Sequence, residues 1–134
     1  MDVNQKGMKG MIKVIDDLTD RGLYVFPAFD DHSPIDLIAV DDNGVVIRLQ
    51  VKYRQPMQGK KSVKYELHAR SVVNGKVVPI DRNMIDGWAL YASASSKVVY
   101  IPISAMDDKT SMVIDPDRDY GAWAVWQRQH PAKV

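Results

Sequence analysis

Residues 35–54 read IDLIAVDDNGVVIRLQVKYR, and the pattern of this stretch is the strongest structural signal in the chain. Two runs rich in apolar and β-branched residues, 35–40 and 45–54, flank the polar segment 41–44, which is typical of a β-hairpin turn. Apolar and polar side chains alternate along the second run, so one of its faces should be buried and the other solvated. The sequence therefore predicts two neighbouring antiparallel strands.

The length of the turn decides which residues of the two strands are neighbours. A three-residue loop at 42–44, with its glycine in the left-handed conformation, would place Asp36 opposite Gln50. Their Cβ atoms would be about 5 Å apart, with Lys52 two residues further along the same face. A two-residue turn at 43–44 would instead direct Asp36 to the apolar face. We predict the first register.

The polar side chains that this register brings together suit phosphodiester hydrolysis. That reaction needs a divalent cation to polarise the phosphate, an activated water, and a positive charge to stabilise the transition state. Asp36 offers a carboxylate, Gln50 a side-chain carbonyl and Val51 a main-chain carbonyl, which are the hard oxygen ligands that Mg²⁺ prefers. Lys52 can orient the water and stabilise the developing charge. The alternative interpretation is an ordinary exposed strand that carries Gln and Lys.

The flanking sequence predicts one α+β domain over residues 1–134. Apolar residues at three- and four-residue steps predict an amphipathic helix over 7–21. Its expected buried stripe consists of Met8, Met11, Ile12, Ile15 and Leu18. Further strands are expected at 23–29, 62–70, 86–92, 98–103 and 111–114, with a turn at 74–75 and a final helix at 120–129.

Positive charge gathers in one segment, although the net charge of the chain is only +1. Between residues 48 and 70, seven basic residues face a single acidic one, Glu66. Such a local excess predicts a nucleic-acid surface, and a solvated charged face is the alternative. The candidate DNA-binding residues are Arg48, Arg54, Lys60, Lys61, Lys64 and Arg70, together with His32 in the loop before the first strand of the hairpin.

The composition excludes several other classes of protein. The chain has no cysteine, which rules out disulfides and thiolate metal sites. No apolar run approaches the roughly 18 residues of a membrane span, and the first residues lack the apolar stretch of a signal peptide. We therefore expect a cytoplasmic protein without a membrane partner.

Short motifs along the chain occur in a characteristic order. They are Lys6-Gly7 and Gly10, GLYVF at 22–26, HSPIDLI at 32–38, LQVK at 49–52, NGK at 74–76, IDGWALY at 85–91 and VYIPI at 99–103. This order resembles the PD-(D/E)XK nucleases, and particularly the bacterial and phage homing endonucleases of group I intron type whose motif reads Gln-Val-Lys. The resemblance covers about the first 105 residues.

The resemblance implies a restriction-endonuclease-like fold, a mixed central sheet flanked by helices, and cleavage of double-stranded DNA. It implies that Asp36, Gln50 and the main-chain carbonyl of Val51 bind Mg²⁺, for which Mn²⁺ can substitute, and that Lys52 assists the attacking water. It also implies a homodimer or homotetramer, because one such active site cuts one strand.

One residue departs from the family pattern. Relatives usually place Glu directly after the glycine of the first helix, whereas Met11 follows Gly10 here. Asp36 is then the one anionic ligand of the usual set, so the affinity for Mg²⁺ should be low. Either cleavage is naturally weak or absent, or this residue has been substituted to abolish it. The hypotheses are a metal-dependent endonuclease, a nuclease-fold protein that binds DNA without cutting it, and a structural protein unrelated to nucleic acids.

Other chemically interesting residues are assigned structural roles. We expect no partner for His68 or His130, and take Asp86 and Trp88 as parts of a strand. Trp123, Trp126 and Arg128 could stack on DNA or grip it, although aromatic residues near a C-terminus more often belong to the core or a subunit interface. No motif of the chain indicates which strand or loop enters a groove of the DNA, so we predict no target sequence.

Overall fold

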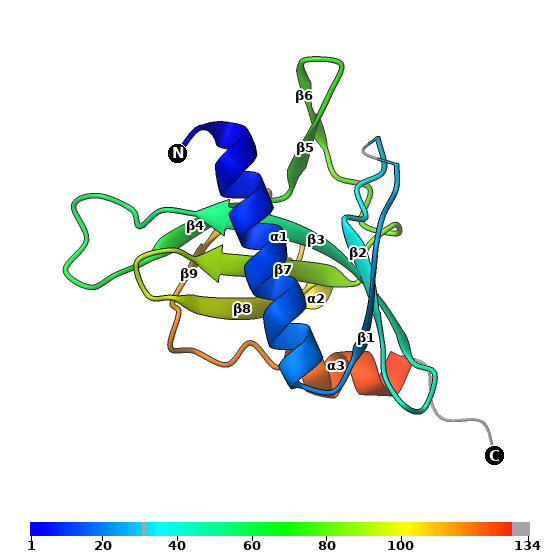
Figure 1. The fold of residues 1–134 in the computed structure, drawn as a ribbon. Coiled ribbons are helices and arrows are strands. Elements are labelled where there is room, and N and C mark those ends of the chain that lie inside the picture. The colour runs from blue at the N-terminus through cyan, green and yellow to red at the C-terminus, as the bar shows by residue number, and fades with distance from the viewer. Residues whose placement is uncertain (31, 130–134) are drawn as a thin grey trace.

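A computed structural model describes residues 1–30 and 32–129 of the chain (Figure 1). Its helices are α1 (Val3–Asp20), α2 (Ile103–Met106) and α3 (Ala122–Gln129). Its strands are β1 (Tyr24–Pro27), β2 (Leu37–Val40), β3 (Val46–Arg54), β4 (Tyr65–His68), β5 (Arg70–Val73), β6 (Lys76–Pro79), β7 (Gly87–Ala92), β8 (Lys97–Pro102) and β9 (Ser111–Ile114). None of the helices in this part of the chain is long and apolar enough to cross a membrane.

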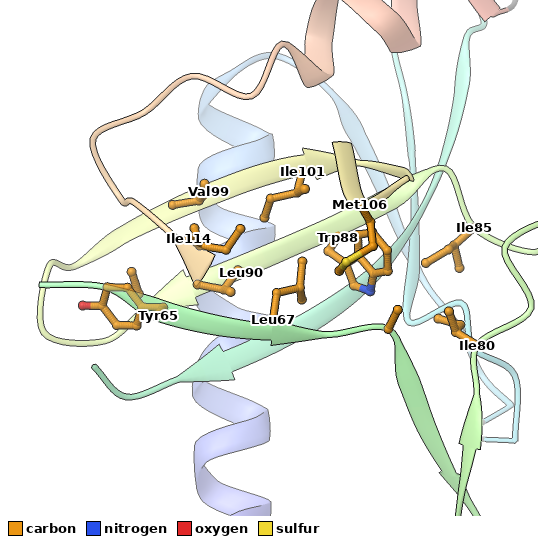
Figure 2. Close-up of a cluster of buried hydrophobic side chains, with 12 residues drawn as sticks. Tyr65, Leu67, Ile80, Ile85, Trp88, Leu90, Val99, Ile101, Met106 and Ile114 are labelled. Atoms are coloured by element: carbon orange, nitrogen blue, oxygen red, sulfur yellow. The ribbon is translucent and has the colours of Figure 1, made fainter. Parts of the chain in front are cut away.

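The central sheet has five strands in the order β1-β2-β3-β7-β8. Strands β3 and β7 run parallel, and the other neighbouring pairs of this sheet are antiparallel. Two ribbons, β4 with β9 and β5 with β6, lie outside it. Helix α1 crosses one face of the sheet, and the β4–β9 ribbon lies on the other (Figures 1 and 2). The predicted α+β fold with a mixed central sheet is confirmed.

The hairpin between β2 and β3 has the predicted three-residue loop. Leu37 pairs with Leu49, and Gly44 closes the loop at a φ of 80°, which glycine adopts without strain. Continued by one residue, this register places Asp36 opposite Gln50. The predicted register is therefore confirmed.

Helix α1 packs on the sheet through a face that overlaps the predicted stripe in part, because Leu18 is buried and Met11 and Ile15 pack against the core. Its buried residues are Gly10, Val14 and Leu18. A Cβ atom added at Gly10 would lie 3.3 Å from the Cβ of Tyr53, so the helix approaches β3 most closely at this glycine. Met8 and Ile12 are 62% and 56% exposed, and the prediction that they are buried was wrong. The spacing of apolar residues could not reveal that a glycine fixes the rotation of the helix.

The face of β3 that was predicted to be solvated is covered by a second layer. Apolar side chains fill the space between the sheet and the β4–β9 ribbon, among them Tyr65, Leu67, Trp88, Leu90, Ile101, Met106 and Ile114 (Figure 2). Gln50 on this face is 6% exposed, and Lys52 and Arg54 are half-buried. Alternation along a strand identifies its polar side chains but not those that another layer covers, so the prediction of a solvated face was wrong.

Strand β6 and the short helix α2 were not predicted from the sequence. Strand β6 pairs with β5, and Asn74 and Gly75 form the turn between them with φ values of 51° and 76°. This hairpin projects from the body of the molecule (Figure 1). The predicted strand at 62–70 is divided between β4 and the start of β5, and the short helix α2 follows β8.

Candidate active site

Asp36 is held against the edge of β3 immediately before β2 begins. Its main-chain N–H donates to the carbonyl oxygen of Leu49 at 2.9 Å. Its carboxylate accepts a hydrogen bond from the N–H of Val51 at 2.7 Å. Burial raises the pKa of Asp36, while the Val51 N–H and the Lys52 ammonium favour the ionised form and partly offset this. The carboxylate thus occupies the position where a further residue of β2 would otherwise pair.

The main-chain carbonyl of Val51 points to the same edge as the carboxylate of Asp36. The N–H and C=O of one residue lie on the same side of a strand, and the Val51 N–H is bonded to Asp36. Strand β2 pairs with β3 only as far as Leu49, so this carbonyl lies beyond the paired region. Two hard oxygen atoms of different residues therefore face one edge.

Gln50 is oriented by a buried tryptophan of the parallel strand. Gln50 pairs with Trp88 in the ladder between β3 and β7, and its Oε1 accepts a hydrogen bond from the indole Nε1 at 3.1 Å. An indole N–H can only donate, so the amide oxygen must face Trp88. From the sequence, Trp88 was expected only to be part of a strand. Only the pairing of β3 with β7 reveals this contact, because 38 residues separate the two.

Lys52 lies on the same face of β3 as Gln50 and is surrounded by other cations. Its Nζ donates to the main-chain carbonyl of Arg70 at 3.2 Å. Burial and the nearby guanidinium of Arg54 lower the pKa of Lys52 to about 8, with a smaller contribution from Arg70 and an opposing one from Asp36. A lysine with such a pKa exchanges protons near neutral pH.

The register of β2 and β3 brings Asp36, Gln50 and Lys52 to one part of β3, where the charges of Asp36 and Lys52 interact.

Met11 is half-buried and packs against the apolar cluster between α1 and the sheet, which includes Leu37 and Leu49. Within residues 1–30 and 32–129, no three His, Cys, Asp or Glu side chains lie close enough to hold a metal ion together. A cation at Asp36 would consequently depend on carbonyl oxygens as well.

Arg48, one of the predicted DNA-binding residues, forms a bidentate ion pair with Asp86. Its Nη2 lies 3.0 Å from Oδ1 of Asp86, and its Nε lies 3.2 Å from Oδ2. Asp86 is 7% exposed. The Nη1 of Arg48 donates to the carbonyl of Asn83 at 2.9 Å. These contacts occupy most donors of the guanidinium, so Arg48 also links β3 to the start of β7.

The remaining basic candidates differ in their surroundings. Lys64 pairs with Asp115 at 3.0 Å, and the guanidinium of Arg54 donates to the main-chain carbonyls of Glu66 and Tyr53. The exposed candidates are Lys60, Lys61, Arg70 and His32. The positive segment of the sequence is thus partly structural and partly exposed.

The secondary candidates have mostly structural environments. His68 has a partner after all, because its Nε2 pairs with Glu66. Trp126 is fully buried and donates to the carbonyl of Asp86 at 3.0 Å, and the ring of Trp123 packs edge-on against Tyr100. Arg128 is exposed, and His130 lies outside the described residues.

The mixed five-stranded sheet packed against α1 is the fold of a PD-(D/E)XK nuclease domain. The model of the PD-(D/E)XK endonuclease family matches residues 1–120, and the chain belongs to that family. The solved structure of a bacterial homing endonuclease, I-Ssp6803I, has the same fold, with a TM-score of 0.71 and 17% sequence identity over 96% of this chain and 95% of that chain. The fold is therefore restriction-endonuclease-like, as predicted. No curated protein matches the chain.

Proposed function

We propose that this chain is a divalent-metal-dependent endonuclease that hydrolyses phosphodiester bonds in double-stranded DNA. The observation that carries the proposal is the register of β2 and β3, because it lays Asp36 beside Gln50 with Lys52 on the same face. Membership of the PD-(D/E)XK endonuclease family supports nuclease chemistry. A homing type of target is supported by the fold shared with a bacterial homing endonuclease.

The oxygen donors near Asp36 fit a hard cation such as Mg²⁺, with Mn²⁺ as its substitute. The carboxylate of Asp36, the main-chain carbonyl of Val51 and Oε1 of Gln50 would hold it, and the Gln50 oxygen would be shared with the Trp88 indole. When bound, the cation would polarise the phosphate. A nearby cation would also favour the ionised form of Asp36, which burial alone disfavours.

Lys52 is proposed to handle the proton of the attacking water. Because its pKa is lowered to about 8, a useful fraction of the amine is neutral at slightly alkaline pH. The neutral amine can accept a proton from water, and the resulting ammonium can stabilise negative charge on the phosphate. Arg54 and Arg70 add positive charge to the same region.

Nicking of supercoiled plasmid DNA in Mg²⁺ or Mn²⁺ tests the proposal. We would compare the wild-type protein with Asp36→Ala, Met11→Glu and the double variant. The proposal predicts that Met11→Glu creates or raises cleavage and that Asp36→Ala removes it in both backgrounds. Cleavage that survives Asp36→Ala, or no cleavage by any of the four proteins, would contradict it.

A second candidate function is DNA binding without cleavage. It is favoured by Met11, which stands where relatives usually carry a Glu and packs against apolar side chains instead. A site with one carboxylate would bind Mg²⁺ weakly. In the plasmid assay this candidate predicts that the wild-type and Met11→Glu proteins both shift the DNA in a gel and that neither cuts it.

The proposed DNA surface follows the basic segment from residue 48 to residue 70. Arg48 and Lys64 are each paired with a carboxylate, so we expect smaller contributions from them than from Arg54, Arg70 and the exposed lysines at 60–61. Lysine and arginine contacts to phosphate release counterions, so the affinity should fall steeply with salt. A binding constant that changes little between about 50 and 200 mM salt would argue against this surface.

We also propose that the protein works as a homodimer or homotetramer. Cutting both strands requires two such sites, and the outer part of the sheet carries exposed apolar residues that support self-association. Tyr24 and Phe26 of β1 are 59% and 58% exposed, and they lie across from Val40 and Ile38 of β2. Light scattering should give a molar mass of at least two chains, and Phe26→Lys should reduce it. A monomeric wild-type protein would contradict the proposal.

A further inference from the structure

We propose that the ribbon of β5 and β6 enters the major groove of the DNA, beside the phosphate that reacts. The inference rests on the proposed nuclease function. Strands β5 and β6 form a two-stranded sheet of their own, and a turn at Asn74 and Gly75 joins them. The ribbon projects from the body of the molecule (Figure 1).

The root of the ribbon is fixed next to the candidate active site. The main-chain carbonyl of Arg70, the first residue of β5, accepts a hydrogen bond from Nζ of Lys52 at 3.2 Å. Ile80 follows β6 directly and is buried in an apolar cluster against which Ile35 packs. Ile35 is the residue before Asp36. A DNA strand bound at Asp36 and Lys52 would therefore lie at the root of the ribbon.

The ribbon carries positive charge and apolar surface into the solvent. Residues 70–79 include Arg70 and Lys76 but no aspartate or glutamate. Arg70 is exposed at the root and Lys76 at the tip, and Val77 beside the tip is 61% exposed. DNA complements both features, because it offers phosphates to the cations and thymine methyl groups to valine.

The dimensions of the ribbon favour the major groove over the minor one. Each strand has four residues, so the tip lies about 13 Å from the root. The major groove is about 12 Å wide and about 8.5 Å deep, and it admits a two-stranded ribbon. The backbones of two paired strands are about 4.8 Å apart, so with their side chains they exceed the minor groove, which is about 6 Å wide. A ribbon rooted at the DNA backbone can therefore reach the base edges.

The tip presents side chains of the types that recognise bases. Asn74 and Gly75 have φ values of 51° and 76°, as in the tight turns that keep the end of a hairpin narrow. Asn74 and Lys76 are both exposed. In the major groove, asparagine pairs with adenine and lysine with guanine. The tip would then contact bases, while Arg70 at the root would contact phosphate.

Site-directed cross-linking tests the inference, because the chain has no cysteine of its own. Lys76→Cys places a single thiol at the tip of the ribbon. The full-length variant is mixed with duplexes that carry a disulfide-ended tether on N4 of a cytosine, in the major groove, or on N2 of a guanine, in the minor groove. We expect a disulfide bond to the cytosine tether and none to the guanine tether.

The control for cross-linking is Asn43→Cys. Asn43 is exposed in the loop between β2 and β3, which lies at the opposite end of the molecule from the ribbon (Figure 1). This variant should link to neither tether. Thiol reactivity alone would give similar yields for the two variants, whereas insertion of the ribbon gives a product only with Lys76→Cys.

Binding of a fluorescent duplex measures what the tip contributes. Lys76→Gln should weaken binding about 3- to 10-fold and make it less dependent on salt, because one cation no longer faces the DNA. Lys13→Gln makes the same change on the exposed side of α1 and should bind like the wild-type protein.

The outcomes separate this inference from the proposed function. A link from Lys76→Cys to the cytosine tether, with weaker binding by Lys76→Gln, supports the ribbon. If the wild-type protein binds duplex DNA but Lys76→Cys links no better than Asn43→Cys, or links to the guanine tether, the inference fails and the proposed function stands. A disulfide between two copies of Lys76→Cys in place of the DNA link would assign the ribbon to a subunit contact instead. If the wild-type protein neither binds nor cuts duplex DNA, both are overturned.

Discussion

The two ends of β3 carry similar residues on the same face and use them differently. Near its start, Arg48 is fixed by the carboxylate of Asp86 and ties β3 to β7. Near its end, Lys52 contacts a main-chain carbonyl and lies close to the guanidinium of Arg54 and to the half-buried carboxylate of Asp36. A basic side chain on a strand is therefore structural or reactive according to the partner that a distant segment supplies.

The largest difference between the two ends should appear in cleavage. Lys52→Met should lower the nicking rate at least about 100-fold, because it removes both the proton acceptor and the ammonium. Arg48→Met should lower it less than Lys52→Met does, since its charge is already balanced by Asp86. The rates are measured on supercoiled plasmid in Mn²⁺, in whichever of the wild-type and Met11→Glu proteins cuts faster. Equal losses of nicking rate in the two variants would show that Lys52 and Arg48 do not differ in their roles.

Stability should depend more on the carboxylate of Asp86, which pairs with Arg48, than on the carboxylate of Asp36. Asp86→Ala leaves the half-buried Arg48 charge without its partner and should lower the free energy of unfolding by about 3 kcal/mol. Asp36→Asn should change it by about 1 kcal/mol or less, because burial already disfavours the ionised Asp36. Urea unfolding measures both values. A larger loss for Asp36→Asn would make that carboxylate a structural residue.

Two buried tryptophans, Trp88 and Trp126, each donate a hydrogen bond to one of these regions. Trp88→Phe removes the indole bond to Gln50, and Trp126→Phe removes the equivalent bond to the carbonyl of Asp86. Each should lower the free energy of unfolding by about 1 kcal/mol, because a buried hydrogen bond is lost. If Trp88 orients Gln50 for the reaction, only Trp88→Phe should also slow plasmid nicking. Equal nicking rates in the two variants would limit Trp88 to a packing role.

Lys52 should also make the stability of the protein depend on pH. The pKa of Lys52 is about 8 in the folded protein, below its ordinary value of 10.5. Between these two values the unfolded chain binds the extra proton, so the contribution of Lys52 to stability is fully present above pH 10.5 and is lost as the pH falls through about 8. Urea unfolding between pH 7 and 10 should therefore show a rise that Lys52→Met removes. The same rise in that variant would assign the effect to other groups.

Local features made much of the hairpin predictable. The polar segment before Val45 and the left-handed Gly44 set the loop length, and the loop length set the register that lays Asp36 beside Gln50. Turn chemistry acts within a few residues, so it can be worked out from the sequence. Alternation along β3 likewise identified which side chains share a face.

Long-range features escaped the sequence for equally physical reasons. The parallel pairing of β3 with β7 joins segments 38 residues apart and brings Trp88 to Gln50. The ribbon of β4 and β9 covers the polar face of β3, and no local pattern announces this. The rotation of α1 depends on the close approach at Gly10, a residue that contributes nothing to an apolar stripe.

The proposed cation site at the edge of β3 can be examined by locating Mn²⁺ through its anomalous scattering in crystals of the protein. The account predicts one ion at the edge of β3, in contact with the carboxylate of Asp36 and the main-chain carbonyl of Val51, and no ion there in crystals of Asp36→Ala. Mn²⁺ that binds only elsewhere on the protein, or that stays at β3 without Asp36, would contradict it.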